Sequence, residues 1–126
     1  MSTLNVSNIT DGTTTVGTSY VINGSAKAWL NMNGNSTIGL RDSFNTSSIA
    51  DRGTALYTHN FTSSMDNSNY AGSGNAQNTD GDATGRNRMQ VTNALNASSA
   101  YLHAFDTSGL ADDVGYVTSM IHGDLA

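Results

Sequence analysis

An all-β fold is predicted for this chain: an antiparallel, jelly-roll-like β-sandwich of about eight short strands. The 126 residues include 15 Asn, 16 Ser, 16 Thr and 13 Gly, but no Glu or Pro. Asn, Ser and Gly favour turns, and Thr suits a pleated, half-buried surface. Apolar and polar residues alternate in short runs that turn signals separate at roughly 8 to 12 residues. We place an N-terminal arm at residues 1–18 and the sandwich domain at residues 19–126.

The charge balance argues against nucleic acid as a partner. Ten Asp stand against one Lys and four Arg, a net charge of −5. Phosphate binding needs a basic patch, and the local cluster here is Arg86 with Arg88. No run approaches the ~20 apolar residues that cross a bilayer, and the N-terminus lacks a secretory pattern, so we expect no membrane insertion. Without Cys, stability must come from the sheet core or from oligomerisation.

The N-terminal arm has too few apolar residues to form a core alone. They alternate weakly up to Ile9, and a Gly/Thr-rich turn follows at Asp11-Gly12. We expect the arm to lie along another surface, either of its own domain or of a neighbouring subunit. A short strand at 20–22 is predicted to lead into the domain.

Residues 23–34 are the clearest strand, because an Asn-Gly pair closes each end and tolerates the positive φ of a tight turn. Ala28, Leu30 and Met32 alternate with Lys27 and Trp29. The first three residues are therefore expected on the core face and the last two on the opposite, polar face. We expect the Trp29 ring to be covered by the arm or by a neighbouring subunit.

The next two segments are predicted as a strand and a loop. Residues 37–44 are the expected hairpin partner of the Trp29 strand, with Leu40 and Phe44 on its apolar face. Residues 45–54, NTSSIADRGT, are expected to form a loop that a buried Ile49 anchors.

The run at residues 55–61 predicts a core strand with Tyr57, His59 and Phe61 on one face. No Cys, Glu or second His stands near His59 at metal-ligand spacing. We therefore expect His59 to be a hydrogen-bonded core or interface histidine.

Residues 70–76 are predicted to form a strand in which Gly72 and Gly74 permit close approach of another side chain, such as Trp29, or of a neighbouring subunit. In the loop that follows, Asn78, Asp80 and Asp82 stand at alternate positions, as calcium ligands often do. An EF-hand pattern fails there because its Gly and bidentate Glu are missing. An Asp-Gly hairpin turn is the expectation, and no metal site is assigned.

Three more strands are predicted, at residues 86–93, 99–106 and 116–123. The faces of the middle one are ambiguous, because Tyr101 and His103 oppose an equally apolar face. A strand covered on both faces fits a subunit interface or the centre of a sandwich.

No catalytic residues, metal ligands or cofactors are assigned, because the chain has no nucleophile elbow, P-loop, GxGxxG or Glu-based carboxylate pair. A polar surface with scattered aromatic rings suits protein interfaces and also glycan binding. The glycan-binding residues are not identified. The predicted interface residues, toward the oligomer or a larger particle, are Tyr20, Lys27, Trp29, Tyr101 and His103.

A specific pattern runs through residues 23–76, somewhat under half of the chain. It is carried by Asn23 to Trp29, Asn31, Gly34, Arg41, Ser43 to Asn45, Ser47 to Ile49, Asp51, Gly53, Tyr57, Thr58, Asn60 to Thr62, Met65, Asn69 and Tyr70. The pattern resembles a module of tail-fibre and other virion proteins of marine bacteriophages, cyanophages in particular. His59 departs from it, since the family usually has Val there, and Arg52-Gly53 replaces Asn-Gly.

The resemblance implies a virion structural β-domain, commonly trimeric, with no catalytic residues to carry over. We expect a small tail-fibre-like module that is made in the host cytoplasm and assembled on the particle exterior as a tail fibre, tail or collar component. Its partners would be itself, as a homotrimer, and other phage virion proteins. The alternatives are a capsid decoration protein or a module that adsorbs to a host surface glycan.

Overall fold

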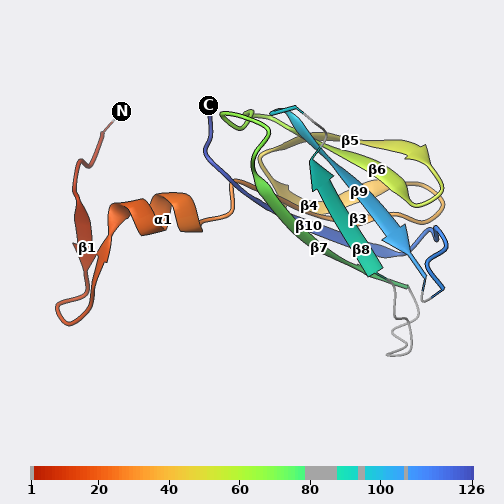
Figure 1. Cartoon of the computed structure of the whole chain (residues 1–126), viewed down its shortest axis with the longest axis horizontal. Helices are drawn as coiled ribbons and strands as arrows, with labels where there is room; N and C mark the ends of the chain where they lie inside the picture. The colour runs from red at the N-terminus through yellow and green to blue at the C-terminus, as the bar shows by residue number, and fades with distance from the viewer. Residues whose placement is uncertain (1, 79–87, 94–95, 107) are drawn as a thin grey trace.

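The computed structural model describes residues 2–78, 88–93, 96–106 and 108–126, with side chains left out for 88–93. Two four-stranded antiparallel sheets pack against each other, and a small hairpin with one helix lies beside them (Figure 1). The predicted class, an all-β antiparallel sandwich, is confirmed.

Eight strands of the described chain form the two sheets. The first sheet, in spatial order, consists of β4 (Gly39–Phe44), β3 (Ala28–Asn33), β10 (Tyr116–His122) and β7 (Ala71–Gln77). The second consists of β5 (Thr46–Gly53), β6 (Leu56–Phe61), β9 (Ser99–Phe105) and β8 (Arg88–Asn93). The β3–β4, β5–β6 and β8–β9 pairs are hairpins within one sheet, whereas the other connections cross between sheets. The first and last strands of the sandwich therefore lie side by side.

The segment before the sandwich, residues 2–24, is named the arm segment here. It contains β1 (Asn8–Thr10), β2 (Thr15–Gly17) and α1 (Thr18–Gly24), and it projects from one end of the sandwich (Figure 1). The β1–β2 turn falls at the predicted Asp11-Gly12, where Gly12 has a φ of +96°. The backbone N–H groups of Thr14 and Thr13 donate to Asp11 Oδ1 at 2.8 and 2.9 Å and lower the pKa of that carboxyl.

The predicted strand at residues 20–22 is wrong, because these residues lie in α1. The helix has no side-chain cap at its N-terminus and buries no residue. Its last carbonyls do have a partner: Lys27 Nζ donates to Ile22 O and, at 3.2 and 2.9 Å, to Ser25 O and Oγ. A cation at a helix C-terminus satisfies free carbonyls and complements the dipole. Local propensity favoured a strand, but among the described residues these positions pair with no strand.

Replacing Lys27 by Met is expected to loosen α1 while the sandwich stays folded. The Met side chain keeps the buried stem but removes the cation at the helix end, a change of about 0.3 to 1 kcal/mol. Hydrogen exchange should show faster exchange of the amides at residues 18–25, with the melting temperature nearly unchanged. Arg52→Met removes a cation from the other side of the molecule and should leave these amides as they are. Equal exchange in both variants would contradict the role of Lys27.

The loop predicted at residues 45–54 is also wrong, because β5 occupies it. Short turns lie only at its two ends. Asn45 has a φ of +53°, and its side chain donates to Lys27 O and accepts from Ser63 N. Gly53 and Ala55 have positive φ at the other end. Ser and Thr predict a turn here, whereas between these corners Thr46, Ser47 and Ser48 belong to a strand that pairs with β6.

The predicted apolar face of β4 is wrong for Phe44, which is 54% exposed. The β3–β4 register shifts between Asn31 and Met32, so Arg41 is an extra residue that has no partner across the ladder. Such a bulge moves the following residues to the other face of the sheet. Phe44 consequently pairs with the outward-facing Trp29.

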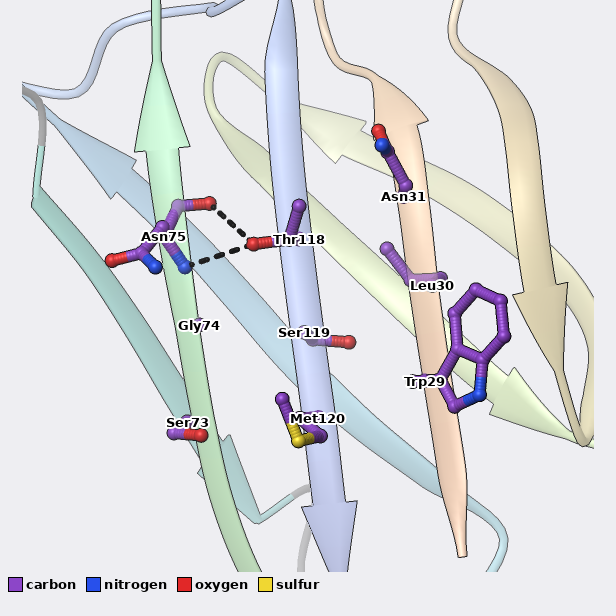
Figure 2. Close-up of a pocket in the computed structure, with 9 residues that line it drawn as sticks. All are labelled: Trp29, Leu30, Asn31, Ser73, Gly74, Asn75, Thr118, Ser119 and Met120. Carbon is purple, nitrogen blue, oxygen red and sulfur yellow. Dashed lines mark hydrogen bonds between the residues drawn. The ribbon is translucent and has the colours of Figure 1, made fainter. Parts of the chain in front are cut away.

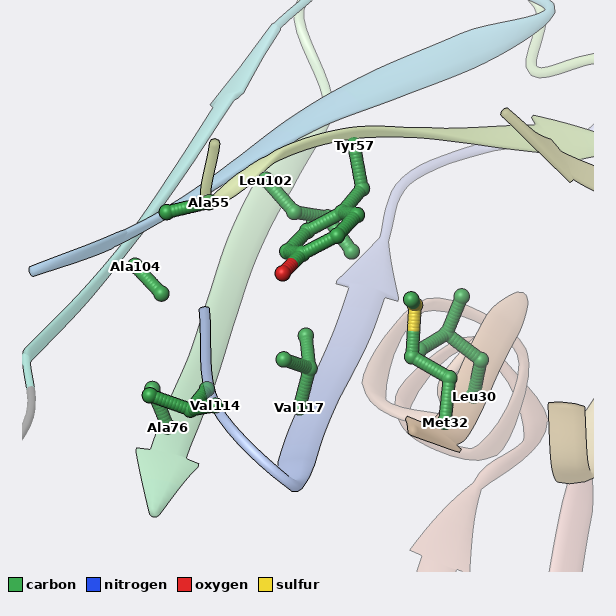
Figure 3. Close-up of a cluster of buried hydrophobic side chains, with 9 residues drawn as sticks. All are labelled: Leu30, Met32, Ala55, Tyr57, Ala76, Leu102, Ala104, Val114 and Val117. Carbon is green, nitrogen blue, oxygen red and sulfur yellow. The ribbon is translucent and has the colours of Figure 1, made fainter. Parts of the chain in front are cut away.

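Two contiguous groups of buried side chains fill the space between the sheets. The larger one (Figure 3) consists of Leu30, Met32, Ala55, Tyr57, Ala76, Leu102, Ala104, Val114 and Val117. The second consists of Ala28, Phe61, Met65, Tyr70, Ala100 and Ile121. The predicted inward faces of β3 and β6 are confirmed by this burial pattern.

Candidate functional site

An open groove crosses the outer face of the first sheet. We name it the Trp29 groove (Figure 2); its volume is about 550 Å³. The residues that line it are Trp29, Leu30, Asn31, Ser73, Gly74, Asn75, Thr118, Ser119 and Met120. They come from β3, β10 and β7, three neighbouring strands that are far apart in the sequence.

Side chains of unequal size produce this groove. Strand register aligns Trp29 with Met120, and Met120 with Ser73. Figure 2 shows Trp29 and Ser73 on opposite sides of β10, with Met120 between them. The large indole ring on β3 and the small hydroxymethyl group on β7 differ in height above the sheet, and this difference forms the groove.

The polar groups of the groove are uncharged. Thr118 Oγ1 accepts from Asn75 N at 3.3 Å and donates to Asn75 O at 3.4 Å, both long for hydrogen bonds. Asn31 Oδ1 accepts from Arg41 at 3.4 Å. Within the described part of the chain, the side chains of Ser73 and Asn75 have no hydrogen-bond partner. These amide and hydroxyl groups are thus accessible to a ligand.

Aromatic and apolar residues continue around the groove. Phe44, Met120 and Tyr116 are 54%, 47% and 41% exposed. The Arg41 guanidinium lies 4.1 Å from the centre of the Tyr116 ring and donates to Met32 O and Gly115 O at 2.6 and 2.7 Å. The positive charge of Arg41, which contacts the lining residue Asn31, is therefore already held by carbonyls and by a ring face.

The five predicted interface residues lie at three separate places. Trp29 lies half-buried on the outer face of the first sheet. Tyr101 and His103 lie on the outer face of the second sheet, on the opposite side of the sandwich. Tyr20 is 75% exposed on α1, and Lys27 is buried beneath the end of that helix.

The outer face of the second sheet carries its own ring contacts. The Arg52 guanidinium lies 4.1 Å from the centre of the Tyr101 ring. The His103 and Phe105 rings are 3.9 Å apart at their centroids. Among the described residues, His103 Nε2 is a buried atom that has no hydrogen-bond partner. These rings cover β9 from outside, as the ambiguous faces of this strand suggested.

His59 is a hydrogen-bonded core histidine, as predicted. It is fully buried; its Nδ1 lies 3.0 Å from Ser119 Oγ and its Nε2 lies 2.8 Å from Thr46 Oγ1. Burial lowers the pKa of His59 to about 4, so the ring is neutral at pH 7. A catalytic Ser-His pair needs an accessible hydroxyl and an orienting carboxylate. Here both partners are hydroxyls and Ser119 Oγ lies inside the core, so the cluster is structural.

The arm segment presents a second apolar surface. A groove of about 530 Å³ runs between the chain start and α1. Its lining consists of Thr3, Leu4, Asn5, Val6, Ile9, Thr18, Val21 and Ile22. No residue of the arm segment is buried.

Sequence reasoning found Trp29 but missed its neighbours in the groove. Alternation in residues 116–123 does place Met120 and Thr118 on one face, but it does not say which strand lies beside them. Gly74, expected to approach Trp29, lines the same groove with β10 in between. The loop positions Asp80 and Asp82, and Arg86 with the side chain of Arg88, lie outside the described residues.

Comparisons with known proteins found no matching family model, no similar curated protein and no similar solved structure. Across the described ranges, no three His or Asp side chains come close enough together to hold a metal ion. In the same ranges, no helix has the length and apolar character needed to cross a membrane.

Proposed function

We propose that this chain is a bacteriophage virion structural protein, a small tail-fibre-like module on the particle exterior that its arm segment attaches to neighbouring protein. The observation that carries the proposal is the exposure of the arm segment. None of its residues is buried, although it holds seven large apolar side chains. These are Leu4, Val6, Ile9, Val16, Tyr20, Val21 and Ile22.

Contact with another chain would stabilise the arm segment by removing its apolar side chains from water. Burying one apolar side chain contributes roughly 1.5 to 3 kcal/mol. The arm segment projects from one end of its own sandwich (Figure 1). Residues 25–27 alone connect α1 to β3, and Lys27 binds the carbonyl of Ile22 at the end of the helix. The apolar residues of the arm segment are therefore available to a different chain. The similarity of residues 23–76 to virion modules supports particle assembly, and a homotrimer is the proposed state.

The double variant Tyr20→Ser/Ile22→Ser is expected to lose the oligomer and keep the fold. Tyr20 and Ile22 are 75% and 59% exposed, so their replacement should leave the sandwich melting temperature unchanged. Size-exclusion chromatography with light scattering gives the state of assembly. Leu110→Ser is the matched control, because Leu110 is 67% exposed but belongs to the sandwich. A monomeric wild type, or a double variant that still assembles, would remove the arm segment from this role.

A capsid decoration protein is the second candidate, since an apolar arm serves a capsid lattice as well as a tail. Gold-labelled antibody on purified particles separates the two: label along the tail supports the tail component, and label over the head supports decoration. Absence of the protein from purified particles would exclude both.

A further inference from the structure

We propose that the Trp29 groove binds a neutral pyranose sugar. The inference rests on the groove and does not depend on assembly through the arm segment. Its volume of about 550 Å³ falls in the range of small-molecule sites. Its lining combines one indole ring with amide and hydroxyl side chains on three strands of a single sheet.

A pyranose matches both kinds of group. One face of such a ring carries C–H bonds, which are attracted to the electron-rich face of an aromatic ring. Its edge carries hydroxyls, each of which needs a hydrogen-bond partner once water is removed. The groove offers Asn75 and Ser73, whose side chains have no partner among the described residues, and Thr118, whose bonds are long. A purely apolar ligand would leave these groups without partners.

The charge of the lining selects a neutral ligand. None of the nine lining residues is ionisable. An anion would need a cation, and Arg41 nearby is held by Met32 O, Gly115 O and the Tyr116 ring. A cationic ligand would find no carboxylate in the lining. Phosphorylated and acidic sugars are therefore expected to bind more weakly than neutral ones.

The indole stands on a rigid support. β3 is paired on both sides, with β4 and with β10, and Thr46 Oγ1 donates to Trp29 O at 3.3 Å. Preorganised groups lose little entropy on binding, which favours affinity. Multiple copies on one particle would raise the avidity of such a site.

The test uses the full chain, whose single Trp reports directly on the groove. Neutral methyl hexopyranosides and glucuronic acid are titrated while Trp29 emission is followed, and a glycan array extends the set. The expected result is a saturable emission change with a neutral sugar and a weaker one with the acid. Asn75→Ala should weaken binding about fivefold, the loss of one hydrogen bond. Asn60→Ala, which removes an amide from the outer face of the opposite sheet, should bind as the wild type.

Trp29→Leu should abolish binding, measured by saturation-transfer NMR because the reporter is lost, while the melting curve shows whether the variant folds. The proposal is overturned if no neutral sugar binds by titration or array, or if the acidic sugar binds as tightly as the neutral ones. It is also overturned if Asn75→Ala and Asn60→Ala bind sugar with the same affinity. If no sugar binds and Asn75→Ala or Trp29→Leu changes the oligomer, the face is an interface between copies. A monomeric protein that binds sugar would keep this inference and remove the arm-based assembly.

Discussion

Gly34→Ala is expected to destabilise the protein by about 3 kcal/mol, because it adds a methyl group where the core has no space. A Cβ at Gly34 would lie 2.6 Å from Tyr57 Oη and 2.9 Å from Val114 O. Tyr57 is fully buried and donates to Gly34 O at 2.6 Å and to Asp113 Oδ1 at 3.2 Å. Relief of the contact would therefore displace a buried hydroxyl from its partners.

The hydroxyl of Tyr57 belongs to a hydrogen-bond network that a Cβ at Gly34 would disturb. Burial and the nearby Asp113 carboxylate raise the pKa of the Tyr57 hydroxyl, so it remains a donor at all ordinary pH values. Asp113 Oδ1 also accepts from Ala55 N at 2.6 Å, at the β5–β6 turn. One oxygen thus links the turn to the core, and a shift of the ring would disturb both.

Gly39→Ala is the matched control, because a Cβ there meets no atom within 4 Å and the residue has no positive φ. Its stability should stay within about 0.5 kcal/mol of the wild type. Urea unfolding followed by circular dichroism measures both variants. In a Tyr57→Phe background, Gly34→Ala should cost less than in the wild type, because the hydroxyl is gone. Equal losses for Gly34→Ala and Gly39→Ala would contradict the geometry.

A fall in stability of about 3 kcal/mol between pH 6.5 and pH 4 is expected from His59. Its pKa is lowered by burial from 6.5 to about 4 in the folded protein. In this range the unfolded chain binds a proton at His59 and the folded protein does not, so acid favours unfolding. The contribution of His59 is fully present above pH 6.5 and is lost as the pH falls toward 4.

His59→Gln isolates this effect, because the amide still bonds hydroxyls but does not titrate. The variant should be less stable at pH 7, where the Thr46 and Ser119 bonds are disturbed, and its stability should change much less from pH 6.5 to 4.5. His103, His122 and the Asp residues are present in both proteins, so the difference between the two curves belongs to His59. Parallel curves from urea unfolding at each pH would refute the assignment.

Period-two alternation was reliable wherever a strand lies between a core and an outer face. It placed Ala28, Leu30 and Met32 inward on β3, and Trp29 outward. It failed at Phe44, because a bulge at Arg41 reverses the alternation of β4. Pairing geometry of this kind depends on the partner strand and leaves no mark in the local pattern.

Turn composition was less reliable, because Ser, Thr and Asn occur throughout this chain. They concealed β5, whose corners are limited to Asn45 and the residues from Gly53 to Ala55. Likewise, a strand was predicted at residues 20–22, whereas these residues lie in α1, where Lys27 binds the carbonyl of Ile22. Pairing with β6 outweighed the weak local preference at β5, and a contact between near neighbours in the sequence did so at α1.

By itself, the sequence determined the all-β class, most of the strands and the outward position of Trp29, because these follow from composition and from the two-residue period. Only the tertiary structure decided what lies beside Trp29. Met120 comes from the last strand and Ser73 and Asn75 from a third, and hydrogen-bonded register brings them together. Register between distant strands is a property of the whole sheet, so the groove arises only when all three strands are paired.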